Sequence, residues 1–83
     1  MYNVSIVTPE EIVFEGEAIS LVAPGSVGYL EILSHHAPLI TILKEGTQTI
    51  TDASKQKKVW QITGGVLEVS QNKASVLVDK IKI

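Results

Sequence analysis

The residues best suited to chemistry are two adjacent histidines, His35 and His36, because imidazole titrates near neutral pH and binds metal ions. Neighbouring side chains on an extended chain point in opposite directions, so this pair is poorly placed to bind one ion together. The chain has no third histidine and no cysteine to complete a zinc site. We therefore expect one histidine to form a hydrogen bond within a loop and the other to lie at a contact surface.

Other combinations of polar residues also fall short of a catalytic set. Ser34 precedes His35, but a serine hydrolase needs a strained turn that presents the hydroxyl, and this segment has no such motif. Two pairs of carboxylates, Glu10 with Glu11 and Glu15 with Glu17, are typical of turns and edge strands. The sequence therefore favours a protein that is not an enzyme and binds no cofactor.

Gly64 and Gly65 could be taken for a phosphate-binding loop, which runs from a strand into the N-terminus of a helix. Here the glycines lead into an alternating apolar stretch, Val66 to Val69, that is typical of a strand. We expect them to form a turn before that strand, where glycine permits close packing or a positive φ.

The elements that position these residues are predicted to be β-strands. No window sustains an apolar period of 3.6 residues, whereas short β-branched or alternating runs recur between turn residues. Many short strands at this spacing are typical of a sandwich or a barrel. The predicted strands are Tyr2–Val7, Ile12–Glu15, Ala18–Ala23, Gly28–Leu33, Leu39–Leu43, Gly46–Thr51, Lys57–Thr63, Gly65–Ser70 and Lys73–Val78.

Apolar residues are predicted on both faces of several strands. Leu67 and Val69 share one face of their strand, while Val66 lies on the other with Glu68. Apolar residues make up 45% of the chain and charged residues only 19%, with a mean hydropathy of +0.25. A chain this small cannot bury all of that surface, so part of it is expected to meet a partner.

Length and charge exclude several classes of function. The 83 residues, taken as one domain over 1–83, carry a net charge of −2, which does not fit a nucleic-acid partner. The longest apolar stretch, Pro38 to Leu43, is too short to span a membrane, and the N-terminus lacks the pattern of a secretory signal. The absence of cysteine fits a reducing compartment such as the cytoplasm.

Several segments, in the same order, resemble the N-terminal domain of the F-type ATP synthase epsilon subunit. The first part of the signature runs from Gly28 to Leu33 and the second from His36 to Leu39. The other matching segments are Phe14-Glu15-Gly16, Lys44-Glu45-Gly46, Ile62-Thr63-Gly64-Gly65-Val66-Leu67-Glu68-Val69 and Val76-Leu77-Val78-Asp79.

The resemblance implies an all-β fold, a flattened sandwich of about ten short strands in two sheets. It also implies a non-catalytic rotor subunit of the central stalk, which couples the gamma subunit to the polar loops of the membrane c-ring during proton-driven ATP synthesis. Such a subunit is peripheral to the bacterial inner membrane, on its cytoplasmic side. By position, the c-ring contact would involve Gly25, Ser26, Val27, Gly28 and Tyr29. The gamma contact would involve Thr8, Pro9, Glu10, His36, Ala37 and Pro38.

The sequence departs from the family pattern at several places. Tyr29 stands where the family often has an acidic residue, Glu31 where it usually has glycine, and Ser34-His35 where a proline-glycine pair is common. The family usually adds a C-terminal helical hairpin that restrains rotation and, in some members, binds ATP. The sequence ends at Ile83 without one, which predicts a short form that lacks inhibition and nucleotide sensing by the hairpin.

A different class of function stays open from the sequence alone. A free-standing β-sandwich could bind a carbohydrate or a peptide, with Trp60 and Tyr29 as its aromatic platform. Fold by itself does not separate the two hypotheses.

Overall fold

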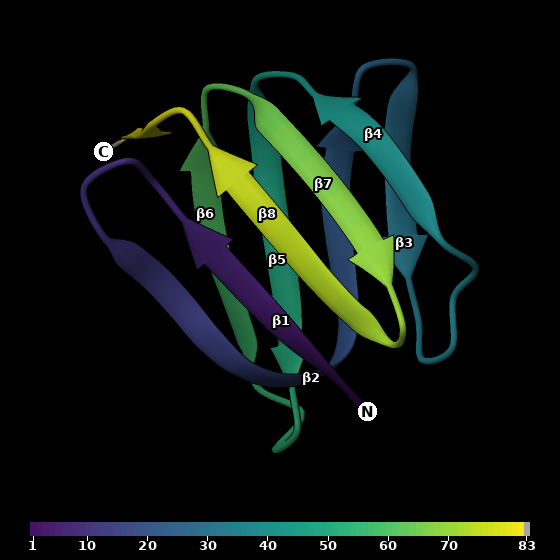
Figure 1. Ribbon diagram of the computed structural model, residues 1–83. Helices are drawn as coiled ribbons and strands as arrows, with labels where there is room; N and C mark the ends of the chain where they lie inside the picture. The colour runs from purple at the N-terminus through teal and green to yellow at the C-terminus, as the bar shows by residue number, and fades with distance from the viewer. Residues whose placement is uncertain (83) are drawn as a thin grey trace.

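The computed structural model describes residues 1–82, and within that range the chain forms nine strands and no helix (Figure 1). The strands are β1 (Tyr2–Val7), β2 (Ile12–Gly25), β3 (Gly28–Ile32), β4 (Leu39–Leu43), β5 (Gly46–Asp52), β6 (Lys57–Ile62), β7 (Gly65–Ser70), β8 (Lys73–Val78) and β9 (Ile81–Lys82). The prediction of an all-β fold is confirmed, and the architecture is a flattened sandwich.

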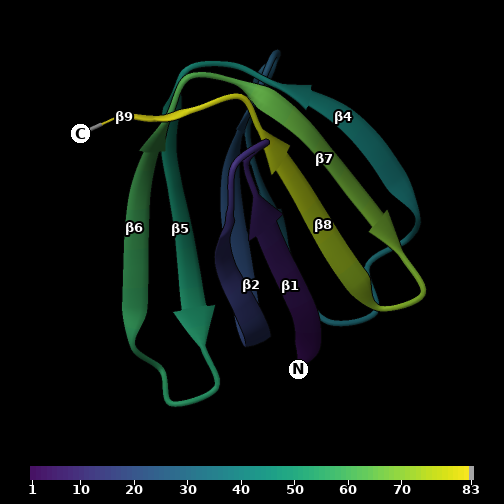
Figure 2. The same ribbon diagram turned by 60° about the vertical axis from the view of Figure 1, so that its left-hand side comes forward.

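The strands lie in two layers, which Figure 2 shows nearly edge-on. The first layer has the order β4-β7-β8-β1 and continues into the first half of β2, with β1 and β8 parallel. The second half of β2 pairs with β3 on one side and with β5 on the other, and β6 and β9 follow β5. Strand β2 therefore belongs to both layers.

The prediction of two short strands, Ile12–Glu15 and Ala18–Ala23, was wrong because β2 is continuous across them. Gly16 weakens the strand pattern in the sequence, but in the fold it pairs with Val4 of β1 and the ladder runs on. The pairing of β2 with β5 is irregular between Ala18 and Ser20, where the strand passes from one layer to the other. Irregularities of this kind bend a strand.

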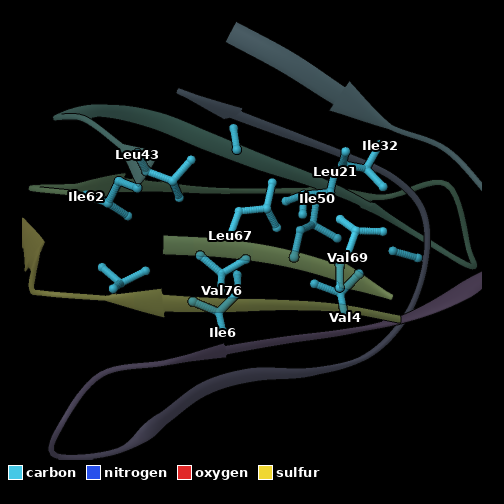
Figure 3. Close-up of a cluster of buried hydrophobic side chains, with 14 of the residues drawn as sticks. Val4, Ile6, Leu21, Ile32, Leu43, Ile50, Ile62, Leu67, Val69 and Val76 are labelled. Carbon is cyan, nitrogen blue, oxygen red and sulfur yellow. The ribbon is translucent and has the colours of Figure 1, made fainter. Parts of the chain in front are cut away.

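The core fills the space between the layers (Figure 3). Because side chains alternate along a strand, each layer presents every second residue to the other. The largest buried apolar side chains come from both layers and include Ile6, Leu67 and Val76 from the first and Leu21, Ile32, Ile50 and Ile62 from the second. Gln48 of β5 is also fully buried, and neither its amide oxygen nor its amide nitrogen has a hydrogen-bond partner within residues 1–82.

Predicted bounds agree with the structure for β1, β4, β7 and β8, and differ by one residue at the ends of β3, β5 and β6. The short strand β9 was not predicted. It pairs with Gln61 and Ile62 of β6, and Lys82 forms an ion pair with Glu45 in the β4–β5 turn. The hydrogen bond and the charge of Lys82 lower the pKa of the Glu45 carboxyl.

The prediction for Gly64 and Gly65 is confirmed. Both have a positive φ, of 151° and 158°, and together they lead from β6 into β7. A Cβ atom on Gly65 would lie 2.1 Å from the carbonyl oxygen of Leu77 on the neighbouring strand. Close approach of two backbones therefore requires glycine at this position.

Candidate docking surfaces

The predicted c-ring segment forms the turn between β2 and β3, which we call the tip (residues 25–29). Gly25 pairs with Gly28, so Ser26 and Val27 alone make the turn. The Ser26 N–H donates to the carbonyl oxygen of Ile42 at 2.9 Å, which fixes the turn against β4. Val27 is 99% exposed, an unusual environment for a valine. The tip is therefore a turn that is fixed by a backbone hydrogen bond to β4 and exposes the apolar side chain of Val27 to solvent.

Tyr29 braces the tip from the outer face of the second layer. Its hydroxyl accepts a hydrogen bond from the Thr47 N–H at 3.0 Å, while 57% of the residue stays exposed. A Cβ atom on Gly46 would lie 2.8 Å from this hydroxyl, so the phenol passes directly over the glycine. Glu31 lies further along β3, and its carboxylate accepts a hydrogen bond from the Ser20 hydroxyl at 2.7 Å. Tyr29 and Glu31, two of the residues that depart from the family pattern, thus have partners within this domain.

The first predicted gamma segment, Thr8 to Glu10, forms the turn between β1 and β2. The Thr8 N–H donates to the Glu11 carbonyl at 2.9 Å, and the Glu11 N–H donates to the Thr8 hydroxyl at 3.2 Å. These reciprocal bonds close the turn and leave Pro9 and Glu10 exposed at its end.

The second predicted gamma segment lies in the connection between β3 and β4, which we call the histidine loop (residues 33–38). The His36 N–H donates to the Leu33 carbonyl at 3.2 Å, and the Nδ1 atom of His36 lies 2.7 Å from the Ala37 carbonyl oxygen. The His35 side chain is exposed. One histidine therefore forms a hydrogen bond within the loop, as predicted, and the role of the other at a contact surface stays a prediction.

The two predicted gamma segments do not come together in the fold. The β1–β2 turn lies at the end of the sandwich where β8 ends, and the histidine loop lies beside the β7–β8 hairpin at the other end (Figure 1). Six residues of β8 separate the ends, roughly 20 Å at about 3.3 Å per residue. The tip lies at the same end as the β1–β2 turn (Figure 1).

An exposed apolar row crosses four strands at the end of the sandwich that carries the β1–β2 turn, and no local pattern in the sequence identifies it. On the outer face of the first layer, Ile42 pairs with Val66, Val66 with Leu77, and Leu77 with Val7. Ile42 is 64% exposed and Leu77 57%. We call these four residues the apolar row. Because they come from four strands, only the register of the sheet reveals that they are neighbours.

The apolar row extends toward both predicted gamma segments. Ile40, which is 70% exposed, lies on the same face of β4 as Ile42 and leads back to Pro38 in the histidine loop. At the other end, a shallow hollow is formed beside the β1–β2 turn. Its lining residues are Val7, Thr8, Pro9, Gly65, Val66, Leu77, Val78 and Asp79. A continuous apolar path thus crosses the outer face from one end of the sandwich to the other.

The next row on the same face begins with Ile40 on β4 and is polar on the other three strands. Ile40 pairs with Glu68, Glu68 pairs with Ser75, and Ser75 pairs with Ser5. The contrast between the two rows shows that the apolar row is a localised feature and not a general property of this layer. A localised apolar patch with a polar border is typical of a protein-binding surface.

Within residues 1–82, no three His, Cys, Asp or Glu side chains are grouped so that they could hold a metal ion.

The titratable group with the largest pKa shift, the Tyr2 phenol, has a structural role. Burial raises the pKa of the Tyr2 phenol to about 12, with a further contribution from the negative charge of Glu31. The Tyr2 hydroxyl donates a hydrogen bond to the carbonyl oxygen of Ile32, so it ties the start of β1 to the end of β3. In the described part of the chain, no helix is long and apolar enough to cross a membrane.

The aromatic platform of the alternative hypothesis is not assembled. The Trp60 ring packs against Phe14, with the ring centroids 5.7 Å apart, and contacts the core from the inner side of β6. The Tyr29 hydroxyl lies beside Gly46 and accepts the Thr47 N–H at the start of β5. The two rings therefore have separate partners within this domain, Phe14 for Trp60 and the Thr47 N–H for Tyr29.

Comparison with known proteins places this fold in a family. The family model described as the β-sandwich domain of the ATP synthase delta/epsilon chain matches residues 1–83. The chain belongs to this family. The resemblance seen in the sequence is therefore confirmed.

Relatives that carry the name ATP synthase epsilon chain cover nearly all of this chain. The protein from Protochlamydia amoebophila is 42% identical over 82 residues, which are 99% of this chain and 56% of the relative. The protein from Chlorobium limicola is 40% identical over 80 residues, 96% of this chain and 91% of the relative. The chain thus spans between about half and nine tenths of the length of these relatives.

Solved structures agree on the fold. A chain in the mitochondrial ATP synthase of Euglena gracilis, in a structure of its OSCP, F1 and c-ring parts, aligns with a TM-score of 0.88 over 95% of this chain and 51% of its own length. A chain in the central stalk and c-ring structure from Tetrahymena thermophila aligns with a TM-score of 0.79 over 96% and 64%. Identities of 15% and 20% show that the fold is kept while the sequence has diverged.

Proposed function

We propose that this domain is a non-catalytic coupling element of the ATP synthase central stalk, which joins the gamma subunit to the c-ring. Membership of the epsilon family supports the assignment. The observation that carries it is the apolar row together with Ile40 of β4, because this path leads from the β1–β2 turn toward the histidine loop. These are the two segments that the family pattern assigns to gamma, and they lie at opposite ends of the fold (Figure 1).

The gamma subunit would lie along the outer face of the first layer. Burial of the exposed apolar side chains of Ile40, Ile42 and Leu77 would supply affinity, at roughly 25 cal/mol for each Å² removed from water. The polar row that includes Glu68 and Ser75 would form the border of this interface. Pro9 and Pro38, at the two ends of the apolar path, would set the orientation of gamma along the face.

The tip would meet the polar loops of the c-ring. It is anchored twice, through the Ser26 N–H to β4 and through the Tyr29 hydroxyl to β5, so it can carry a lateral load without rearranging. Its exposed contact residues are Ser26, Val27 and Tyr29, whereas Gly25 and Gly28 shape the turn. The tip adjoins the apolar row at Ile42, whose carbonyl oxygen accepts the Ser26 N–H, so the proposed c-ring and gamma surfaces meet at this corner of the domain.

In this assembly the domain rotates with gamma and the ring and performs no reaction. It requires neither a cofactor nor a nucleotide for the coupling role. Its place would be the cytoplasmic side of the bacterial inner membrane, where it is held through the complex. The family relation supports this location.

The test is reconstitution with purified gamma and c-ring, followed by cross-linking from a single cysteine. The chain has no cysteine of its own, so Val27→Cys places the only thiol at the tip. Ser54→Cys is the matched control, because it lies in the exposed β5–β6 turn at the opposite end of β5. We expect a cross-link to a c-ring loop from residue 27 and none from residue 54. Failure to bind gamma, or equal cross-linking from both positions, would contradict the proposal.

A further inference from the structure

The β7–β8 hairpin carries a side chain that reaches across to the histidine loop. Its two turn residues, Gln71 and Asn72, both have a positive φ, of 51° and 59°, and they connect the paired residues Ser70 and Lys73. This is the backbone pattern of a type I′ turn, in which asparagine is favoured. Asn72 is partly buried and Gln71 is exposed.

The Asn72 amide bonds to two segments that are distant in sequence. Its Oδ1 atom accepts a hydrogen bond from the His35 N–H at 2.7 Å. Its Nδ2 atom donates to the Met1 carbonyl at 3.3 Å. Within residues 1–82, no other side chain from outside the histidine loop forms a hydrogen bond with that loop. Within residues 1–82, Asn72 therefore makes the one side-chain hydrogen bond that joins the histidine loop to another part of the fold.

His35 needs such a link because its backbone is strained. Its φ is 62°, in the left-handed region that costs a residue with a Cβ atom roughly 1 kcal/mol. The family commonly has glycine at this position, where the same conformation carries little cost. The bond from His35 to Asn72 offsets part of the strain. Asn72 thus stabilises at His35 a conformation that glycine would adopt at little cost.

We infer that Asn72 is a positioning residue that holds the histidine loop in the conformation that binds gamma. The inference rests on the proposed function, since it takes the loop as part of the gamma interface. A loop that is ordered before binding loses less conformational entropy when the complex forms. Without the Asn72 side chain, the loop would sample other conformations, and gamma would bind more weakly although Asn72 itself need not touch it.

Three variants separate the side-chain bonds from the turn. Asn72→Gly keeps access to the positive φ and removes both bonds. Asn72→Asp keeps an acceptor for the His35 N–H but loses the donor to Met1. Gln71→Gly is the control, because it changes the neighbouring turn residue, which has an exposed side chain.

The first measurement is amide hydrogen exchange at His35 in the isolated chain, with core amides such as that of Leu67 as a check on global folding. We expect exchange at His35 to accelerate about tenfold in Asn72→Gly, the factor that corresponds to one hydrogen bond of about 1.4 kcal/mol, and to return near the original rate in Asn72→Asp. An unchanged rate in Asn72→Gly would overturn the inference.

The second measurement is the Kd for purified gamma. We expect Asn72→Gly to weaken binding about fivefold to tenfold, Asn72→Asp to restore it, and Gln71→Gly to leave it unchanged. Faster exchange at His35 with unchanged affinity would overturn the positioning role while the proposed function stands. Absence of gamma binding by the original chain would instead contradict the proposed function, and the exchange data would still report whether Asn72 holds the loop.

Discussion

The hydroxyl of Tyr29 accepts a hydrogen bond from the backbone N–H of Thr47 at 3.0 Å and thereby joins the tip to the start of β5. Thr47 lies next to Gly46, over which the phenol passes. Tyr29 thus has two roles. The residue is 57% exposed and its ring adds to the surface of the tip, and the hydroxyl holds the tip to β5.

Tyr29→Phe should lower the free energy of unfolding by about 1 kcal/mol, because the Thr47 N–H loses its partner. The ring and its exposed surface are kept, so the variant isolates the bond. Denaturation with urea measures the change, and hydrogen exchange at Thr47 should accelerate in parallel. Equal stability with protected exchange at Thr47 would show that the bond makes no contribution.

Gln48→Leu should stabilise the domain by roughly 1 to 3 kcal/mol. The side chain is fully buried and its amide has no hydrogen-bond partner within residues 1–82, so an apolar side chain of similar size removes the cost of desolvation. Gln56→Leu in the exposed β5–β6 turn is the control and should change stability by less than about 0.5 kcal/mol. Thermal and urea denaturation of both variants measure the change in the free energy of unfolding. Destabilisation by Gln48→Leu would mean that the amide makes a favourable contact.

Tyr2→Phe should change how stability depends on pH in the alkaline range. The Tyr2 pKa is about 12 in the folded chain against about 10 unfolded, so the unfolded chain loses this proton first. The contribution of Tyr2 is therefore fully present below pH 10 and is lost as the pH rises from about 10 toward 12, by up to about 1.4 kcal/mol per pH unit.

In the Tyr2→Phe variant this alkaline loss should disappear, while at pH 7 the loss of the bond to the Ile32 carbonyl should cost about 1 kcal/mol. Urea denaturation of both chains at several pH values between about 8 and 11 gives the comparison. Parallel pH profiles for the two chains would contradict the expectation.

Leu77→Glu should weaken binding to gamma by about tenfold or more, because it places a charge in the centre of the apolar row. Ser75→Glu is a matched control, since Ser75 lies two residues earlier on the same exposed face of β8, in the polar row. Both variants should keep the circular dichroism of the original chain. Binding measurements with purified gamma would contradict the proposed interface if the two substitutions had equal effects.

The strands could largely be predicted from the sequence because their pattern is local. The alternation of Leu67 and Val69 with Val66 and Glu68 fixes both the strand and its buried face without any knowledge of neighbours. Strand β9 has only two residues and forms because β6 offers a free edge there, so no local signal identifies it. Continuity of β2 through Gly16 likewise depends on pairing with β1.

The candidate site also has one part that a local sequence pattern identifies and one part that only the fold reveals. The tip could be located from its glycines, since Gly25 and Gly28 bracket a turn between two strands. The apolar row could not, because Ile42 and Leu77 are 35 positions apart in the numbering and become neighbours of Val66 only through the sheet register. Val66 gave the one hint in the sequence, as an apolar residue on the face opposite Leu67.

Strand β2 contributes hydrogen bonds to both layers, to β1 in one and to β3 and β5 in the other. Neither layer can separate from the other without breaking the ladder of this one strand. The two layers therefore cannot unfold independently of each other, and the domain should unfold as a single cooperative unit. A load applied at Val27, in the turn that follows β2, reaches both layers at once, because Gly25 at the end of β2 pairs with Gly28 of β3 in one layer and with Leu43 of β4 in the other.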